Sequence, residues 1–346
     1  MEAKIYPWHQ ENFQRLVKMR ETMPHAMVFH GPEGTGIESF ALAWAKTLLC
    51  ENPQAGQPAC GQCSSCRWFD QGSHPDFVML MPDALNDDEE GVPAAEEEDA
   101  PAKKTKAASK IIPINAIRQL YDFVGITTHR GGLRVILIHP VEAMTTEAAN
   151  ALLKMLEEPP AGTVFLLVTN QVGALLPTIL SRCGKLAFPM PSREMALEWL
   201  ASQEVDDAAM LLAQQGGAPL AALEASKGNA NAKEQAAFLD CLSKPGLSAS
   251  LKAAEDLQKL PVKLPITWMQ RWLYDLASVH LAGTVRYHPD RLDMLTSLAG
   301  RLNLIKLMDM AKSVAQRRRV ADHPLVPRLV LEDMLIDYLK LFAKRP

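Results

Sequence analysis

The chain has 346 residues, of which 48% are hydrophobic and 22% are charged, which is ordinary for a globular protein of two or three domains. Its formal net charge of −4 excludes a general electrostatic attraction to nucleic acid, so any such binding must be local or shared with partners. No apolar run reaches the roughly 18 residues of a membrane span, and residues 1–10 lack the cationic start of a signal peptide. These features predict a cytoplasmic protein with no membrane partner.

A glycine-rich segment follows a short apolar run at residues 26–29, which has the length of a buried strand. A helical pattern then begins, and the order of strand, glycine loop and helix is typical of a phosphate-binding loop. The residues of this loop are Gly31, Gly34, Thr35 and Gly36. A working loop continues with lysine and a hydroxyl residue, but Ile37 and Glu38 stand there. The loop is therefore degenerate, an ordinary glycine turn is the alternative, and passive nucleotide binding stays open.

Four of the six cysteines lie close together after this helix, at Cys50, Cys60, Cys63 and Cys66. The spacing of two residues between neighbouring cysteines can direct several thiolates at one centre, and four thiolates in a tetrahedron suit zinc. No further ligand and no open coordination position are evident, so the pattern predicts a structural zinc site. Free thiols, or a site that has lost its metal, are the alternative.

Residues 83–99 contain nine acidic residues and no basic one, and lysines follow up to residue 110. A segment of this composition has too few apolar residues to join a core, so residues 83–110 are predicted to be a disordered, solvated insertion. Its role stays open.

Alternating strands and helices are predicted along the rest of the first half. Apolar runs predict further strands at residues 76–80, 133–138, 163–168 and 185–188, and helical periodicity predicts helices at 114–127 and 146–156. Such alternation indicates a parallel sheet with flanking helices on both faces. After residue 191 the patterns are helical, so the predicted domains are 1–188, a small helical lid at 189–228, and an all-α domain at 229–346.

Four stretches resemble motifs of bacterial clamp-loader subunits of the AAA+ type. The apolar run 135–138 ends in His139 and Pro140, where such ATPases have Asp-Glu, and residues 146–160 are similar to the helix that follows it. Residues 165–170 resemble the sensor-1 strand, which ends here in Thr169 and Asn170. Residues 178–183 resemble the Ser-Arg-Cys motif, represented here by Ser181, Arg182 and Cys183. By this resemblance the domains are an AAA+ module, a lid and a collar for oligomerisation.

The departures from the family pattern fall in the ATP machinery. The lysine is missing at Ile37, the carboxylates are missing at His139 and Pro140, and Leu220 stands where sensor 2 has an arginine. Arg182 is retained, a combination that resembles the delta-prime subunits of the DNA polymerase III clamp loader.

The resemblance implies a stator without ATPase activity of its own, within a DNA-directed DNA polymerase (nucleotidyltransferase) holoenzyme. Arg182 would act as an arginine finger in trans. The implied partners are the ATPase motor subunits and delta in a pentameric ring, the sliding clamp, and primer-template DNA through the complex.

Two other functions stay open on the sequence alone. One is an autonomous P-loop ATPase with unusual motifs, against which Ile37 and His139 argue. The other is a zinc-dependent DNA-binding module, against which the lack of a basic stripe beside the cysteines argues.

Overall fold

The computed structural model describes residues 2–85, 109–125, 128–129, 132–228, 231–320 and 326–342. The chain divides into two compact units, Met1–Pro191 and Ser192–Pro346. The predicted boundary between a lid and a collar at residue 228 falls inside the second unit and stays a prediction. Of the predicted insertion 83–110, Asp83–Leu85 form a 3₁₀ turn (η2) and residues 86–108 lie outside the described part.

The first unit is built on a five-stranded sheet in which every pairing is parallel, in the order β2-β3-β4-β1-β5. The strands are β1 (Ala26–His30), β2 (Phe77–Leu80), β3 (Arg134–Ile138), β4 (Thr163–Thr169) and β5 (Gly184–Ala187). The prediction of an α/β parallel sheet is therefore confirmed. The strands β1, β3 and β4 are buried over nearly all of their length. A strand buried on both faces needs apolar side chains on both, which is why the sequence shows these strands as continuous apolar runs.

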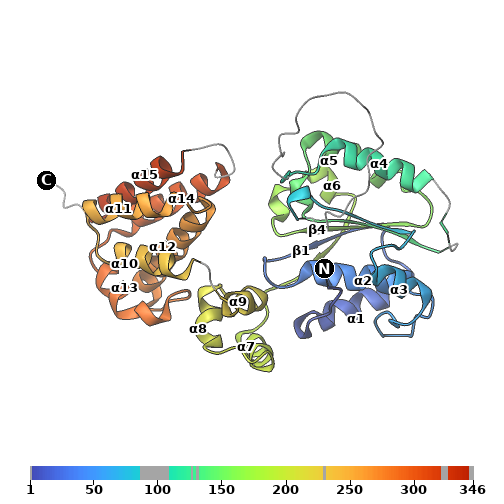
Figure 1. Ribbon diagram of the computed structural model, residues 1–346, viewed down its shortest axis with the longest axis horizontal. Coiled ribbons are helices and arrows are strands. Elements are labelled where there is room, and N and C mark those ends of the chain that lie inside the picture. The colour runs from blue at the N-terminus through green and yellow to red at the C-terminus, as the bar shows by residue number, and fades with distance from the viewer. Residues whose placement is uncertain are drawn as a thin grey trace, which may run out of the picture. The chain divides into compact units, whose positions relative to one another are not determined.

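Helices cover both faces of this sheet (Figure 1). One face carries α1 (Gln10–Met19) and α2 (Ile37–Leu49); the other carries α4 (Ile114–Gly125), α5 (Thr146–Glu157) and α6 (Pro177–Leu180). The alternation along β1 separates the two cores: Met27 and Phe29 pack with the first pair of helices, whereas Ala26 and Val28 pack with the second group.

Short elements complete this unit. The sequence patterns did not predict α3 (Ser64–Asp70), since its seven residues lie among the cysteines. Three of the remaining turns are 3₁₀ helices: η1 (Pro7–His9), η3 (Val141–Ala143) and η4 (Val172–Ala174). Of the predicted helix 114–127, the last two residues lie outside the described part.

The second unit is helical throughout its described residues. Its elements are α7 (Arg193–Ser202), α8 (Ala208–Gln214), α9 (Pro219–Ser226), α10 (Ala232–Ser243), α11 (Leu247–Leu257), α12 (Lys263–Ala282), η5 (Pro289–Arg291), α13 (Leu292–Ala299), α14 (Leu304–Val320) and α15 (Pro327–Lys340). The core gathers around Trp272, whose indole donates a hydrogen bond of 2.9 Å to the Tyr338 hydroxyl. Tyr338 in turn donates to the carbonyl of Leu242 at 2.8 Å, so both buried polar groups are satisfied.

A buried carboxylate on α12 organises the loop that follows this helix. Asp275 is fully buried and accepts backbone N–H groups from Arg286, Tyr287 and His288, together with Nδ1 of the His288 ring at 2.9 Å. Burial raises the pKa of Asp275, but these hydrogen bonds outweigh it and the pKa is lowered. The same loop reaches the turn after α8, where Arg286 donates to the Gly216 carbonyl at 3.0 Å.

In the part of the chain that the structure describes, no helix has the length and apolar character needed to cross a membrane.

Candidate functional site

The glycine loop between β1 and α2 depends on glycine at three positions. Gly34 and Gly36 have φ angles of 74° and 85°, which lie in the left-handed region that favours glycine. Gly31 is required for a different reason, because a Cβ there would lie 2.1 Å from the carbonyl oxygen of Phe188. The glycines therefore have a structural role in this chain that does not depend on a bound phosphate.

Thr35, at the centre of the loop, forms hydrogen bonds with neighbouring residues of the first unit. Its hydroxyl donates to the Pro32 carbonyl at 2.8 Å, and its carbonyl accepts a hydrogen bond of 2.8 Å from the indole of Trp8. Trp8 belongs to η1, so the N-terminal segment is fastened to the loop. The side chain is buried, and its polar atoms stabilise the turn.

His9, next to Trp8, is a buried residue that sequence reasoning missed. It is 1% exposed, and its ring meets Phe40 and Phe188 at centroid distances of 5.4 and 5.0 Å. Among the described residues neither ring nitrogen has a hydrogen-bond partner. Burial lowers the pKa of His9 to about 4, so the ring is neutral at physiological pH.

The two residues that stand in the positions of magnesium ligands contact each other. Nε2 of His139, at the end of β3, lies 3.1 Å from Oε2 of Glu38 in the first turn of α2. Ile37, in the position of the missing lysine, is buried in the core between the sheet and α2. The structure thus joins two substitutions that are far apart in sequence, and the sequence patterns gave no sign of this contact.

The sensor-1-like residues end β4, which pairs with both β1 and β3. Thr169 is fully buried and its hydroxyl accepts the N–H of Gln171 at 2.9 Å. The N–H of Asn170 donates to Oε1 of Glu142 at 3.2 Å. Pro140, the second replaced Walker B position, precedes η3. The structure therefore brings the loop, the His139 position and the β4 terminus to one edge of the sheet.

Arg182 stands directly after α6 and its cap residue, Ser181. Its Nη1 donates to the Thr178 carbonyl at 2.9 Å and to the Ser181 hydroxyl at 3.3 Å. Its Nη2 forms an ion pair of 2.5 Å with Glu157, and the side chain stays 35% exposed. Cys183 is half-buried, and burial raises the pKa of its thiol to about 11, so it is an inert neighbour.

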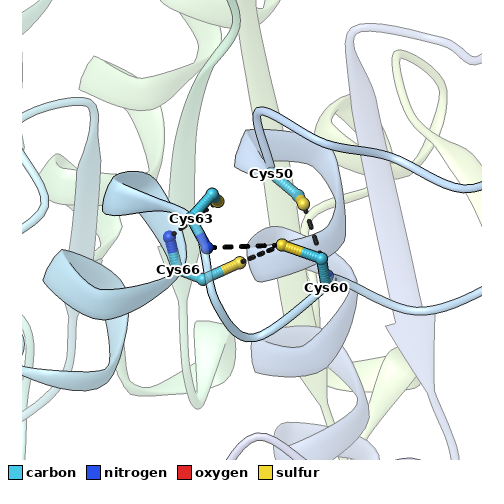
Figure 2. Close-up of side chains that lie close together, drawn as sticks. All are labelled: Cys50, Cys60, Cys63 and Cys66. Atoms are coloured by element: carbon cyan, nitrogen blue, oxygen red, sulfur yellow. Dashed lines mark hydrogen bonds between the residues drawn. The ribbon is translucent and has the colours of Figure 1, made fainter.

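The four cysteines after α2 converge on one point (Figure 2). Cys50 caps α2, Cys63 caps α3, and the four Sγ atoms lie within 4.8 Å of one another. A zinc tetrahedron with Zn–S bonds of about 2.3 Å has its sulfurs roughly 3.8 Å apart, so a small contraction suffices. Cys60 and Cys66 already have their sulfurs 4.0 Å apart. The cluster is therefore positioned to bind a metal ion.

Backbone N–H groups around the cysteines favour the thiolate form that metals bind. The N–H groups of Gln62 and Cys63 point at Sγ of Cys60, at 3.5 and 3.4 Å, and lower the pKa of this thiol to about 6. Burial raises the pKa of Cys50 and Cys66. A bound cation would offset that cost, so the donor set fits zinc.

Taken together, the first unit is an α/β domain in which a glycine loop joins the strand β1 to the helix α2 beside a parallel sheet. The sequence profile of the family described as "DNA polymerase III, delta subunit" matches residues 8–192. The chain belongs to the family of DNA polymerase III delta-prime subunits, as the sequence motifs predicted.

Curated relatives carry this assignment over nearly the whole chain. The chain is 33% identical to DNA polymerase III subunit delta' of Pseudomonas aeruginosa over 98% of both chains. It is 30% identical to the subunit of that name from Escherichia coli K12, over 90% of this chain and 88% of the relative. Among solved structures, a DNA polymerase III gamma subunit-related protein of Thermotoga maritima aligns with a TM-score of 0.47 at 17% identity, covering 97% of this chain and 100% of that one.

Proposed function

We propose that this chain is the clamp-loader subunit that hydrolyses no ATP itself and supplies Arg182 to the ATP site of a neighbouring subunit. One observation carries the proposal. The chain has lost the charged groups of its own phosphate loop, while it keeps an anchored and partly exposed guanidinium after α6.

The first half of the argument concerns the chain's own loop. Phosphoryl transfer needs a lysine on the outer phosphates and a hydroxyl and carboxylate on magnesium. Here Ile37 is buried and uncharged, and the other two positions hold Glu38 and His139, which pair with each other at 3.1 Å. A carboxylate in the first turn of α2 also repels a phosphate that would approach the helix N-terminus. Hydrolysis by this chain alone is therefore not expected.

The second half concerns Arg182. A guanidinium from a neighbouring chain can neutralise the charge that develops on a γ-phosphoryl group, which is worth about 10³–10⁵ in rate at one site. Planar geometry and five N–H donors suit arginine to this task. The Thr178 carbonyl and the Ser181 hydroxyl hold Nη1, so the side chain is restrained before any partner arrives.

The test is steady-state ATP hydrolysis and clamp loading by reconstituted complexes of equal assembly. Arg182→Ala should lower DNA- and clamp-stimulated hydrolysis, and the loss should be partial because other subunit boundaries carry their own arginines. Arg182→Lys should recover part of it, since lysine keeps charge without the planar fork. Arg193→Ala, another exposed arginine in the same chain, is the control. Unchanged rates with Arg182→Ala would refute the arginine-finger role.

The partners follow from this role. We infer a pentameric ring with the ATPase motor subunits and delta, which opens the sliding clamp and places it on primer-template DNA. The net charge of −4 favours contact with DNA through the complex over binding by this chain alone. Residues 229–346, which are helical where the structure describes them, are the proposed collar, and residues 189–228 are the proposed lid.

We further propose that Cys50, Cys60, Cys63 and Cys66 hold a structural zinc ion. When bound, the ion would cross-link the end of α2 to the start of α3. All four ligands are protein thiolates, so no coordination position is left for substrate. This arrangement supports a role in folding and gives no sign of one in catalysis.

Metal analysis of protein purified without chelator should find one zinc per chain. Cys63→Ser should remove most of it and lower the melting temperature, because a structural site contributes its binding energy to folding. Cys241→Ser is the matched control, since this half-buried thiol lies in α10, outside the cysteine cluster. The zinc content of the Cys241→Ser protein should match that of the wild type. Finding no stoichiometric zinc in the wild type would contradict the proposal.

A further inference from the structure

The contact between Arg182 and Glu157 joins two elements of the first unit. Arg182 follows α6, which has only four residues, whereas Glu157 is the last residue of α5, which has twelve. The guanidinium is therefore held on Nη1 by atoms of its own turn and on Nη2 by the carboxylate of a separate helix.

The position of Glu157 is set by the core beneath α5. The helix begins at Thr145, whose hydroxyl accepts the N–H of Ala148 at 3.2 Å, and its inner face buries Leu152 and Leu156 almost completely. The prolines at 159 and 160 prevent the helix from continuing. A residue at this end is therefore carried by a rigid support, although its own side chain is 50% exposed.

Two physical arguments indicate that this carboxylate does not serve stability. An acidic side chain at a helix C-terminus faces the negative end of the helix dipole, which is unfavourable. An ion pair as exposed as this one contributes little to the free energy of unfolding. A role in fixing the guanidinium accounts for the placement better than a role in folding.

We propose that Glu157 is a positioning residue for Arg182, which holds the guanidinium ready for a phosphate of the neighbouring subunit. The inference rests on the arginine-finger function proposed above. The three contacts of Arg182 use at most three of its five N–H donors, so a phosphate oxygen can be bound while they persist. Fixing the arginine beforehand removes side-chain entropy that would otherwise be lost in the transition state.

The experiment uses the reconstituted loader with primed DNA and clamp, at equal assembly. Glu157→Gln keeps the size of the side chain and removes its charge. It should lower kcat for ATP by about two- to fivefold, the range expected of one exposed contact, and leave KM within about twofold. Glu157→Asp keeps the charge and should recover part of the rate. Glu158→Gln, the neighbouring carboxylate, is the matched control and should match the wild type.

A second comparison separates positioning from a structural role. On the Arg182→Ala background, Glu157→Gln should cause no further loss, because its only route of action has been removed. Equal losses on both backgrounds, a rate equal to that of Glu158→Gln, or a faster rate would each overturn the inference. If Arg182→Ala itself changes nothing, the proposed function fails first; if Arg182→Ala lowers the rate and Glu157→Gln does not, only the role of Glu157 fails.

Discussion

The loop from Gly31 to Glu38 and the turn that carries Arg182 belong to the same sheet domain but differ in what they retain. The loop has Gly34 and Gly36 in left-handed conformations, and it has Ile37 and Glu38 where a working phosphate loop has lysine and a hydroxyl residue. The Arg182 turn keeps a charged group with hydrogen-bond and ion-pair partners. The loop is thus distinguished by its backbone geometry, and the Arg182 turn by its side-chain chemistry.

The difference indicates which of these residues the fold itself requires. Gly31 packs against the Phe188 carbonyl and the Thr35 hydroxyl closes the turn on the Pro32 carbonyl, so both residue identities serve the first unit whether or not a phosphate binds. A lysine at position 37 and a hydroxyl residue at position 38 would be needed only for nucleotide chemistry, and this chain has Ile37 and Glu38 there. Arg182 belongs to neither hydrophobic core of the first unit, so its proposed service to another chain is the reason we give for its presence.

The largest expected effect is at Gly31. Gly31→Ala should destabilise the isolated chain by about 3 kcal/mol or more, because the new methyl group meets the backbone carbonyl of Phe188 at 2.1 Å. Thermal unfolding measures this, with Gly173→Ala as control, where an added Cβ meets nothing within 4 Å. A melting temperature equal to that of the control would show that the glycine is dispensable once the phosphate chemistry is gone.

A smaller effect is expected from His9, which packs behind the loop. Its pKa is about 4 in the folded chain and near 6.5 in the unfolded chain, so the unfolded state takes up the proton first as pH falls. The stability that depends on neutral His9 is complete above about pH 6.5 and is lost towards pH 4, at up to about 1.4 kcal/mol per pH unit. His9→Phe should flatten this part of the curve in denaturant titrations. The same slope in both proteins would show that His9 is protonated in place.

The smallest expected effect is no gain of activity. Ile37→Lys restores the phosphate-binding charge, but His139 still stands where magnesium needs a carboxylate, so the isolated chain should not hydrolyse ATP. Turnover assays on protein free of other loader subunits measure this. Turnover at the rate of a motor subunit would mean that one substitution is enough to make the loop functional. The proposed difference between the loop and the Arg182 turn would then be small.

The sheet was predictable because its strands are runs of buried apolar residues. All five predicted strands are present, and no predicted strand end differs from the observed one by more than one residue. By contrast, α3 was missed because its seven residues begin with two serines and a cysteine, which give no helical periodicity. The cysteine cluster itself was predictable, since its spacing is local.

The contacts that the patterns missed join residues distant in sequence. Glu38 and His139 were each recognised as a lost ligand, but their pairing depends on the closeness of α2 and β3 in space. Glu157 lies in the stretch 146–160 that resembles a family helix, but its partner comes from the turn after α6. His9 gave no signal, because a histidine between a tryptophan and polar residues looks like a surface residue until the aromatic rings around it are seen.

The buried carboxylate of Asp275 has a consequence for the order in which the second unit folds. Its bonds to residues 286–288 span 11 to 13 positions, whereas the bond from Arg286 to Gly216 spans 70. Short loops close at a lower entropic cost and faster than long ones, so we expect α12 and its following loop to form a local nucleus. The turn at Gly216 would then dock on a surface that already exists, and replacing Asp275 would mainly slow folding and would change the unfolding rate little.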